Sequence, residues 1–315
     1  MLPTLLHSFS AVTVVLILTA CGYFCSALGW ITPDAKKFLS RYLMRFAVPV
    51  MCVYSLRSNL TREMLGSSLP LLIVSTVTLF ILYVSSTLLG KRMGLAPRQN
   101  SVFSIMCAVS NGMFIGYPMC MELFGESCIP YVMLYFLVNT AFAQLVGVSG
   151  IRRAGTGTKQ SAREELVGFF TTPSVVGVLV GFLLIIVDWT PPAVVMTCAR
   201  YINDTVTPLA LLSAGNVIYG LKLRELRPDR IIGLVLAFRF LIAPAICLVL
   251  CALFGITGLA RDVLVVETAM PVLTQAVVAA TDYGGDEELG AQGVAISTLL
   301  CFITIPLLML FLQVA

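Results

Sequence analysis

Apolar runs of about 20 residues recur along the whole chain, and this pattern limits the fold more than any other feature of the sequence. Each run is long enough to cross a hydrocarbon core about 30 Å thick as a helix. Of the 315 residues, 58% are hydrophobic and 11% are charged, whereas a soluble domain contains roughly twice that share of charge. The sequence therefore predicts an all-α polytopic membrane protein with no soluble domain.

Ten transmembrane spans are predicted from these runs. A polar and basic connection, IRRAGTGTKQSAREELVGFF, separates the fifth span from the sixth. It divides the chain into a first five-helix repeat at 1–150, a cytoplasmic linker at 151–170 and a second five-helix repeat at 171–315. The predicted spans are 8–31, 34–56, 67–90, 100–123, 128–149, 171–188, 192–220, 231–255, 261–282 and 289–313.

Lysine and arginine predict the orientation of these spans. The connections on one side of the membrane contain 13 basic residues, and those on the other side contain 3. Because basic loops stay in the cytoplasm, the richer side is predicted to be cytoplasmic. Both termini of this multi-pass protein of the cell membrane then face outward. The same loops explain the net charge of +4, which requires no nucleic-acid partner.

One sequence pattern occurs twice. RYLMRFAVP begins at Arg41 and RYINDTVTP begins at Arg200, an interval of 159 residues that also separates Trp30 from Trp189. Each repeat contains an odd number of spans, so the second copy enters the membrane from the opposite side. The sequence therefore predicts an inverted-topology repeat, which is typical of secondary transporters. Further pairs at this interval are Gly22 and Gly181, Pro33 and Pro192, and Gly125 and Gly284.

Interrupted helices are expected at corresponding places in such repeats. The fourth span contains Asn111, Gly112, Gly116 and Pro118, and the ninth span has Pro271 near its centre. Proline removes a backbone donor and clashes with the preceding turn. We expect helices 4 and 9 to break, to cross near the membrane midplane and to begin a half-helix at each proline. Two helix N-termini would then direct partial positive charge at one place suited to a carboxylate. Two ordinary proline kinks are the alternative.

At these motifs the chain resembles the auxin efflux carrier family, which includes bacterial malonate-type carriers and plant PIN-type carriers. The resemblance implies that helices 4 and 9 cross at their prolines and that substrate binds at the crossing. It further implies a dimerising scaffold of helices 1, 2, 6 and 7, and a transport domain of helices 3–5 and 8–10 that moves like an elevator. The motifs that are similar are SNGMFIGYP, PLALLSAGNVIYG, RFLIAPAI and ETAMPVLTQAVVAATDYGGD.

The resemblance assigns individual residues to the substrate site. Asn111, Gly116 and Pro118 fall on the motif of helix 4, where Gly112 adjoins Asn111. Met270 and Pro271 fall on the motif of helix 9. The long cytoplasmic loop of many plant members does not occur between the repeats, which favours a compact bacterial-type carrier.

Ionisable residues inside predicted spans are functional candidates, because they cost several kcal/mol unless they are paired or hydrated. Glu267 lies four residues before Pro271. It either binds and releases a proton during transport or forms an ion pair with Arg239 of the eighth span.

Three further charged residues lie on the second and seventh spans. Arg200 and Asp204 are four residues apart and so share a helix face. They either form a structural pair or leave Arg200 as a cation beside an anion pathway. Arg41 and Arg200 either extend to the membrane interface or act as a symmetric pair of gates.

Uncharged polar residues complete the predicted site. Asn139 on the fifth span, and Thr274 and Gln275 just after Pro271, can donate hydrogen bonds to a carboxylate. Of the last two, Gln275 is favoured because it lies one turn past the break.

No enzyme chemistry is predicted. The sequence contains no GxxxxGK[ST] phosphate loop and no metal-ligand cluster, and its one histidine, His7, lies at the terminus. We hypothesise a secondary active transporter of a small organic anion, a dicarboxylate or an amino-acid-like molecule, driven by protons or membrane potential and needing no cofactor. The alternatives are a sodium-coupled organic-acid symporter and a ligand-sensing membrane receptor. The expected partners are the anion, a proton or sodium, membrane lipid and a second copy of the chain.

Overall fold

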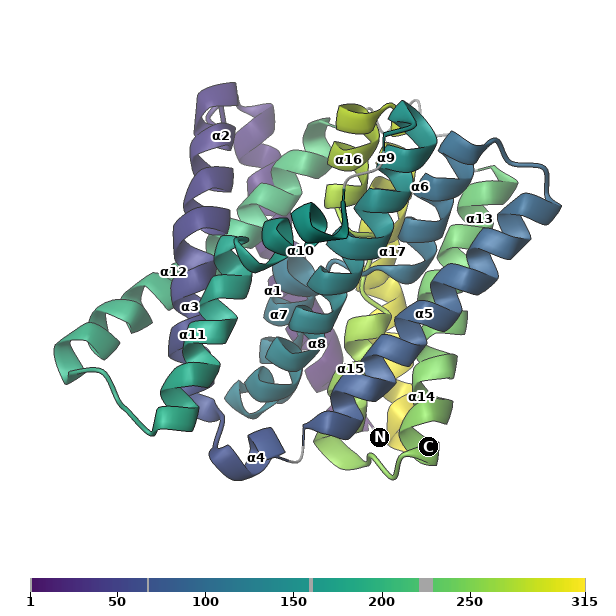
Figure 1. Cartoon of the computed structure of the whole chain (residues 1–315). Helices are drawn as coiled ribbons and strands as arrows, with labels where there is room; N and C mark the ends of the chain where they lie inside the picture. The colour runs from purple at the N-terminus through teal and green to yellow at the C-terminus, as the bar shows by residue number, and fades with distance from the viewer. Residues whose placement is uncertain (1, 67, 159–160, 221–228, 315) are drawn as a thin grey trace.

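The computed structural model describes residues 2–66, 68–158, 161–220 and 229–314, and these form an all-helical molecule (Figure 1). Among them, the strand-like pairing is limited to an isolated antiparallel bridge between Ser110 and Val272. The two ends of the chain lie at the same end of the molecule (Figure 1). Most of the basic connection predicted between spans seven and eight, at 221–228, lies outside the described residues.

The helices follow one another with short connections. Those of the first half are α1 (Leu2–Ala27), α2 (Pro33–Tyr42), η1 (Leu43–Ala47), α3 (Val48–Asn59), α4 (Arg62–Gly66), α5 (Leu69–Arg92), α6 (Pro97–Ala108), η2 (Gly112–Gly116), α7 (Tyr117–Phe124), η3 (Glu126–Cys128), α8 (Ile129–Phe142), η4 (Ala143–Val148) and α9 (Ser149–Thr156). Those of the second half are α10 (Ala162–Phe170), α11 (Pro173–Val187), α12 (Ala193–Gly220), α13 (Arg230–Ala237), η6 (Phe238–Ile242), α14 (Ala243–Leu253), α15 (Gly258–Thr268), α16 (Gln275–Tyr283) and α17 (Glu287–Val314).

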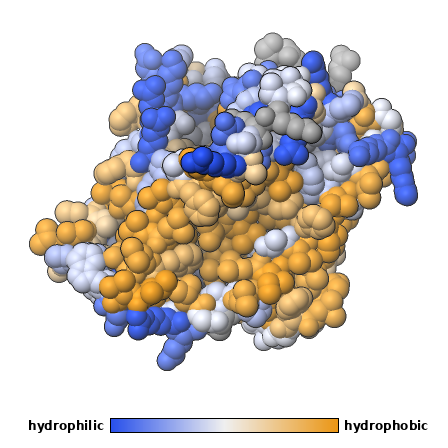
Figure 2. Space-filling view, viewed as in Figure 1, coloured by the Kyte–Doolittle hydropathy of each residue, from blue (hydrophilic) through white to orange (hydrophobic). Residues whose placement is uncertain are grey.

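Several helical stretches are long and apolar enough to cross a membrane. In the described part of the chain there are five, and the pair α10 and α11, bent by 67°, would be a sixth. On the face shown in Figure 2, an apolar band covers the middle of the molecule, with polar residues gathered at its two ends. This fold agrees with the predicted polytopic membrane class, while the division into ten inverted spans stays a prediction. The five stretches are Phe9–Ala27, Leu69–Arg92, Glu126–Thr156, Arg230–Leu253 and Glu287–Leu312.

Three π-helical turns precede prolines inside these helices. Pro49, Pro118 and Pro244 each lie two residues after the end of a π-helix, namely η1, η2 and η6. Proline has no N–H to donate and its ring clashes with the carbonyl of the preceding turn. The wider π turn, with its i→i+5 spacing, lies where that clash would occur. The helix therefore continues past each proline.

Glycine permits the close packing of α1 against α12. A Cβ at Gly22 would overlap the Leu212 carbonyl oxygen, and a Cβ at Gly215 would overlap the Thr19 carbonyl oxygen. On α11, Gly177 allows a similar approach to α3. Small residues of this kind let membrane helices approach backbone to backbone. Because α12 also packs on α3, these four helices form one connected group.

The helix α10 joins this group to α9. Its first turn is stabilised by a capping box between Ser161 and Glu164. Glu165 accepts a hydrogen bond of 2.5 Å from the Ser149 hydroxyl and lies 3.7 Å from the Arg153 guanidinium. The 67° bend between α10 and α11 turns α10 away from the direction of the spanning helix.

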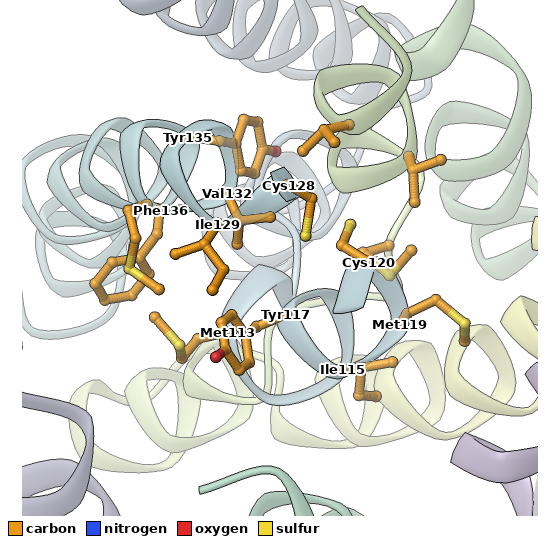
Figure 3. Close-up of a cluster of buried hydrophobic side chains, with 14 of the residues drawn as sticks. Met113, Ile115, Tyr117, Met119, Cys120, Cys128, Ile129, Val132, Tyr135 and Phe136 are labelled. Atoms are coloured by element: carbon orange, nitrogen blue, oxygen red, sulfur yellow. The ribbon is translucent and has the colours of Figure 1, made fainter. Parts of the chain in front are cut away.

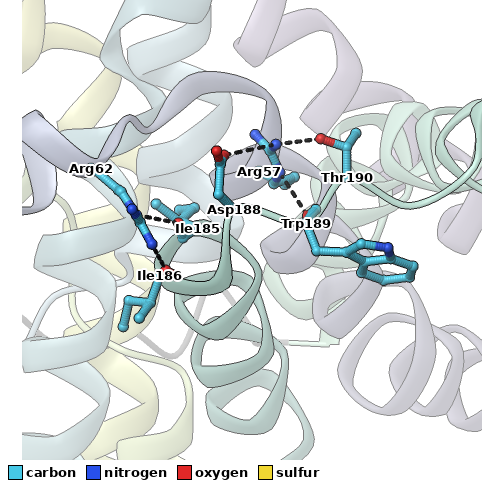
Figure 4. A network of polar contacts seen from close by, with 7 residues as sticks. All are labelled: Arg57, Arg62, Ile185, Ile186, Asp188, Trp189 and Thr190. Atoms are coloured by element: carbon cyan, nitrogen blue, oxygen red, sulfur yellow. Dashed lines mark hydrogen bonds and ion pairs between the residues drawn. The ribbon is translucent and has the colours of Figure 1, made fainter.

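Two arginines hold the opposite end of α11 (Figure 4). Arg57 Nε donates to the Trp189 carbonyl at 3.0 Å, and its guanidinium lies 3.8 Å from Asp188. Arg62 donates to the carbonyls of Ile185 and Ile186. The last carbonyls of a helix have no partner within it, so these cations stabilise the end of α11 against α3 and α4.

We predict that Gly215→Ala lowers the free energy of unfolding by about 1 to 3 kcal/mol, because the added methyl group meets backbone atoms that cannot move aside. The midpoint of thermal unfolding in detergent measures this effect. Gly233→Ala is the matched control, since a Cβ at this helical position on α13 meets no atom within 4 Å. That control should unfold at an unchanged or slightly higher temperature. Equal midpoints for the two variants would contradict the close packing of α1 and α12.

Candidate functional site: the helix crossover

Two interrupted helices meet at the centre of the molecule. α6 ends at Ala108 and a helical stretch resumes at Gly112, while α15 ends at Thr268 and α16 begins at Gln275. Figure 1 places α6 and α16 in the upper half of the molecule and α7 and α15 in the lower half. The Asn111 N–H donates to the Pro271 carbonyl at 2.8 Å, so the two breaks are bonded directly to each other. We call the segments 109–111 and 269–274 the crossover.

The positions of the prolines differ from the prediction that each begins a half-helix. The second half of helix 4 begins at Gly112, and Pro118 lies in the first turn of α7 after the π turn η2. Pro271 lies within the break, four residues before α16. The π turn η2, with its i→i+5 spacing, accommodates Pro118 without a break. The interruption of helix 4 lies at 109–111 instead.

Side chains from neighbouring helices satisfy the backbone of the crossover. Asn139 on α8 accepts from the Ser110 N–H at 3.2 Å and donates to the Ser110 carbonyl at 2.8 Å. Tyr135 forms a 2.9 Å hydrogen bond with the Ser110 hydroxyl. Ser297 on α17 accepts from the Val272 N–H at 3.0 Å. The predicted donor Asn139 is therefore mainly a support of helix 4, although it also lines a cavity.

Arg239 joins the carboxyl ends of both broken helices. Its side chain is completely buried and comes from the π turn η6. Its guanidinium donates to the carbonyls of Cys107 and Ala108 at the end of α6, to that of Thr268 at the end of α15, and to that of Met270 two residues beyond it. Each helix end has a partial negative charge of about half an elementary charge. One guanidinium therefore neutralises two helix ends and fixes their mutual position.

Glu267 does not form the ion pair with Arg239 that was one of its two predicted roles. Its carboxyl is completely buried, and Oε1 accepts a 3.5 Å hydrogen bond from the Cys120 thiol. Oε2 has no hydrogen-bond partner among the described residues. Cys120 and Cys128 lie close enough to interact with Glu267 electrostatically, and Figure 3 shows both thiols within a cluster of buried, mostly apolar side chains.

Two cavities meet at the crossover. The smaller, of about 60 Å³, lies between the crossover, α3 and α8. The larger, of about 370 Å³, lies beside α12 and extends to the exposed side chain of Lys36. A third cavity of about 300 Å³ at the same end of the molecule includes Gln275 and Arg152. The first two cavities share Met44, Asn111, Phe114, Thr274 and Gln275.

The structure brings together only part of the predicted site. Asn111, Thr274 and Gln275 line both crossover cavities, whereas Gly112 and Gly116 face the Glu267 carboxyl. Met270 and Pro271 contribute backbone carbonyls to Arg239 and Asn111 respectively. The side chains of Pro118, Met270 and Pro271 line neither crossover cavity.

The charged residues of the second and seventh spans lie away from the crossover. Arg41, Arg200 and Asp204 are exposed and line neither of its cavities. Arg200 lies over the ring of Tyr201, and Asp204 accepts a hydrogen bond from Asn203. The predicted pair between Arg200 and Asp204 is not formed among the described ion pairs.

Several residues of the site were not predicted from the sequence. Ser110 adjoins Asn111 and could have been included with it. Ser297 occurs one residue before the position equivalent to Asn139 at the repeat interval, which is a signal that could have found it. Lys36 and Gln144 gave no such signal, because their positions depend on how the helices pack.

Two helix N-termini remain without a cap at the crossover. Neither Asn111 nor Thr274, the two N-cap residues, caps its helix with its side chain. The Asn111 Oδ1 atom is buried without a hydrogen-bond partner in the described part of the chain. Helix N-termini present free N–H groups and partial positive charge to anions. This arrangement can bind a small carboxylate from the adjoining cavities.

A helical membrane protein with two broken helices beside a central cavity has the features of a membrane transporter. A family model described as "Membrane transport protein" matches residues 7–309. The chain belongs to this family, and the auxin efflux carrier-like identity indicated by its motifs is confirmed. An uncharacterized transporter of Methanocaldococcus jannaschii is 26% identical over 94% of this chain and 96% of its own length. One from Methanothermobacter thermautotrophicus is 25% identical over 95% and 97%.

We predict that Arg239→Met lowers the free energy of unfolding by about 3 to 5 kcal/mol, because buried carbonyls lose their charged donor. Arg239→Lys should lower it less, since an ammonium group still supplies three donors. Thermal unfolding in detergent measures both. Arg200→Met is the matched control at an exposed position and should change stability by no more than about 0.5 kcal/mol. If Arg239→Met unfolds at the same temperature as Arg200→Met, Arg239 does not hold the crossover together.

Proposed function

We propose that this protein is a secondary active transporter that carries a small organic anion through the crossover by alternating access. The observation on which this rests is the pair of helix N-termini without a side-chain cap, whose N-cap residues Asn111 and Thr274 line both crossover cavities. A bound carboxylate would accept hydrogen bonds from the N–H groups at the start of the helical stretch 112–124 and from the amides of Asn111 and Gln275. At the start of α16, the N–H groups of Ala276 and Val277 already donate to the carbonyls of Leu273 and Thr274. The family gives the transporter class, and the helix N-termini at the site support an anion as the substrate.

The proposed transport cycle uses the predicted inverted repeat. α7 and α16 both end at glycines of positive φ, Gly125 and Gly284, which are equivalent positions at the repeat interval. Gly22 and Gly181, also equivalent, lie at the packing of α1 on α12 and of α11 on α3. These correspondences support two repeats with a scaffold of helices 1, 2, 6 and 7 and a transport domain of helices 3–5 and 8–10. In this proposal the transport domain moves past the scaffold as an elevator, and the carrier is a homodimer.

The cavities suggest which side is open. The larger crossover cavity reaches Lys36, on the side that the basic loops predict to be cytoplasmic. The described conformation is then open to the cytoplasm, with both termini outside. A lysine at the mouth attracts anions toward the site.

Sodium coupling is the second candidate, and one observation favours it. Asn111 Oδ1 and Glu267 Oε2 are buried oxygens without hydrogen-bond partners in the described residues, and sodium binds oxygen ligands. Sodium-dependent binding would favour this alternative. No contact favours the ligand-sensing receptor over a carrier.

We predict that small carboxylates raise the thermal unfolding midpoint of the purified protein, because a ligand that binds the folded state stabilises it by mass action. The panel comprises propionate, benzoate, malonate, succinate and glutamate, each with and without sodium. At about 100 times the dissociation constant the gain is about 2.7 kcal/mol. The expected result is stabilisation by at least one of these anions, and its absence for the whole panel would contradict an anion site.

A pair of variants locates the site. Asn111→Ala should lose most of the stabilisation by the effective carboxylate while remaining folded. Asn59→Ala is the matched control, because Asn59 donates to Ser55 at the end of α3 and lines neither crossover cavity. Equal stabilisation of both variants would place the anion site elsewhere.

A further inference from the structure

Glu267 is a buried acid that the proposed anion site does not use. Its side chain lines neither crossover cavity and is completely buried. An ionised carboxylate at this depth is costly unless a positive charge compensates it. No described lysine or arginine forms an ion pair with Glu267. The compensating charge must therefore come from another source, or the carboxyl must bind a proton.

The Glu267 carboxyl lies against the first turn of the helical stretch 112–124. A Cβ at Gly116 would lie 2.7 and 2.8 Å from its two oxygens, and a Cβ at Gly112 would overlap Oε2. The two glycines thus leave a notch that admits the carboxyl to the positive end of this helix. Asn111, immediately before the notch, opens onto the cavities instead. One helix N-terminus therefore has the substrate cavity on one side and an acid on the other.

The groups that face Glu267 leave it as the dominant titratable site in its surroundings. Cys120 on α7, Cys128 at η3 and Tyr135 on α8 interact with it electrostatically, and Figure 3 shows the three in one cluster. The other helices packed on α15 contribute buried thiols at Cys247 and Cys301. Thiols and phenols ionise only above neutral pH. The cation of the crossover, Arg239, gives its hydrogen bonds to backbone carbonyls.

The charges of the crossover balance in only two ways. The C-termini of α6 and α15 amount to about one negative charge in total, which Arg239 neutralises. The N-termini at Gly112 and Gln275 amount to about one positive charge. One negative charge neutralises them, supplied either by ionised Glu267 in an empty carrier or by a bound monoanion when Glu267 is protonated. The other two combinations leave a net charge in a low-dielectric interior, where it is costly to move.

We propose that Glu267 and the transported anion alternate as the negative charge at the crossover, so that one proton is carried on Glu267 with each monoanion. This proposal rests on the anion-carrier function proposed above and names its coupling ion and the charge of its substrate. The proton passes from water to a Glu267 carboxylate oxygen and forms an O–H bond as the anion enters the cavity. Both are released on the other side, and no covalent bond of the substrate breaks. One positive and one negative charge cross together, so the loaded step is electroneutral.

The proposal fixes the direction of the pH dependence. Protonation of Glu267 removes a negative charge beside the site, so the affinity for an anion rises as pH falls. With one proton linked to one anion, the affinity changes by up to about tenfold per pH unit above the Glu267 transition. In Glu267→Gln the side chain is neutral at every pH. Its affinity should be independent of pH and equal to that of the wild type at low pH.

Infrared spectroscopy of the ligand-free protein tests whether Glu267 titrates. The expected result is a carbonyl-stretch band of a protonated carboxylic acid that disappears as pH rises and is missing from Glu267→Gln. Glu122→Gln, which removes an exposed carboxyl of α7, should retain that band. A spectrum of Glu267→Gln that matches the wild type at every pH overturns the proposal, whatever the substrate is.

A second variant keeps the test valid if Glu267→Gln does not fold. Gly116→Ala crowds only the end of a flexible side chain, so the protein should fold with the carboxyl displaced from the helix N-terminus. The midpoint of the infrared band should then shift in pH. An unchanged midpoint overturns the interaction between the carboxyl and this helix end.

Thermal stabilisation by propionate separates this proposal from the carrier function itself. The measurements are made at several pH values above the ionisation range of propionate. Wild type should be stabilised more as pH falls, and Glu267→Gln equally at each pH. Stabilisation of the wild type that does not change with pH overturns the coupling to Glu267. No stabilisation of either variant by propionate or any other carboxylate of the panel overturns the anion site instead.

Discussion

The fold depends on how a membrane protein satisfies the backbone groups that an interrupted helix releases. Hydrocarbon offers no hydrogen bonds, so such groups are tolerated only where protein or water meets them. Here the carbonyl groups at both breaks are bound by Arg239, and the two breaks are joined by the bond from Asn111 to Pro271. Asn139 and Ser297 support the remaining segments from α8 and α17. The carboxyl ends are thus neutralised, and the amino ends are left to face the cavities. Because Arg239 neutralises only the carboxyl ends of the broken helices, the partial positive charge of the amino ends remains at the crossover.

Glycines and π turns determine how closely the side chains and helices pack at the crossover. Gly112 and Gly116 leave room for the Glu267 carboxyl beside a helix end, because a side chain at either position would occupy the space that the carboxyl fills. The π turn η6 precedes Pro244 and includes Arg239, so the irregularity that accommodates a proline also positions the guanidinium. In α1 and α12, glycine serves packing alone. The sequence distinguishes these uses poorly, because each appears simply as glycine in an apolar run.

Much of the architecture could be predicted from the sequence, and the site only in part. Apolar runs of sufficient length indicated helices, and the motifs of helices 4 and 9 indicated the family. The same motifs located the breaks within a few residues, and placed Asn111, Thr274 and Gln275 at the cavities. The role of Arg239 could not be predicted, because its partners are backbone carbonyls, which no sequence pattern identifies. The pair of Arg239 with Glu267 was one alternative inferred from charge, and the pair of Arg200 with Asp204 was one inferred from charge and a four-residue spacing on one helix face. Arg239 meets carbonyls instead, and the outer pair lies exposed, where an ion pair contributes little.

The short helix α10 sets a geometrical limit on any movement of α9 relative to α11. It contains nine residues, which correspond to a rod about 14 Å long. Its fourth residue, Glu165, is bonded to α9, and its C-terminal end turns sharply into α11. If α9 travels with the transport domain, α10 acts as a connecting rod whose pivot is the bend at Thr171 and Thr172. The stroke available to α9 is then set by the length of α10 between Glu165 and the bend, and by the angle through which this part swings. Shortening α10 by one turn would reduce the travel of the domain without altering any residue of the crossover.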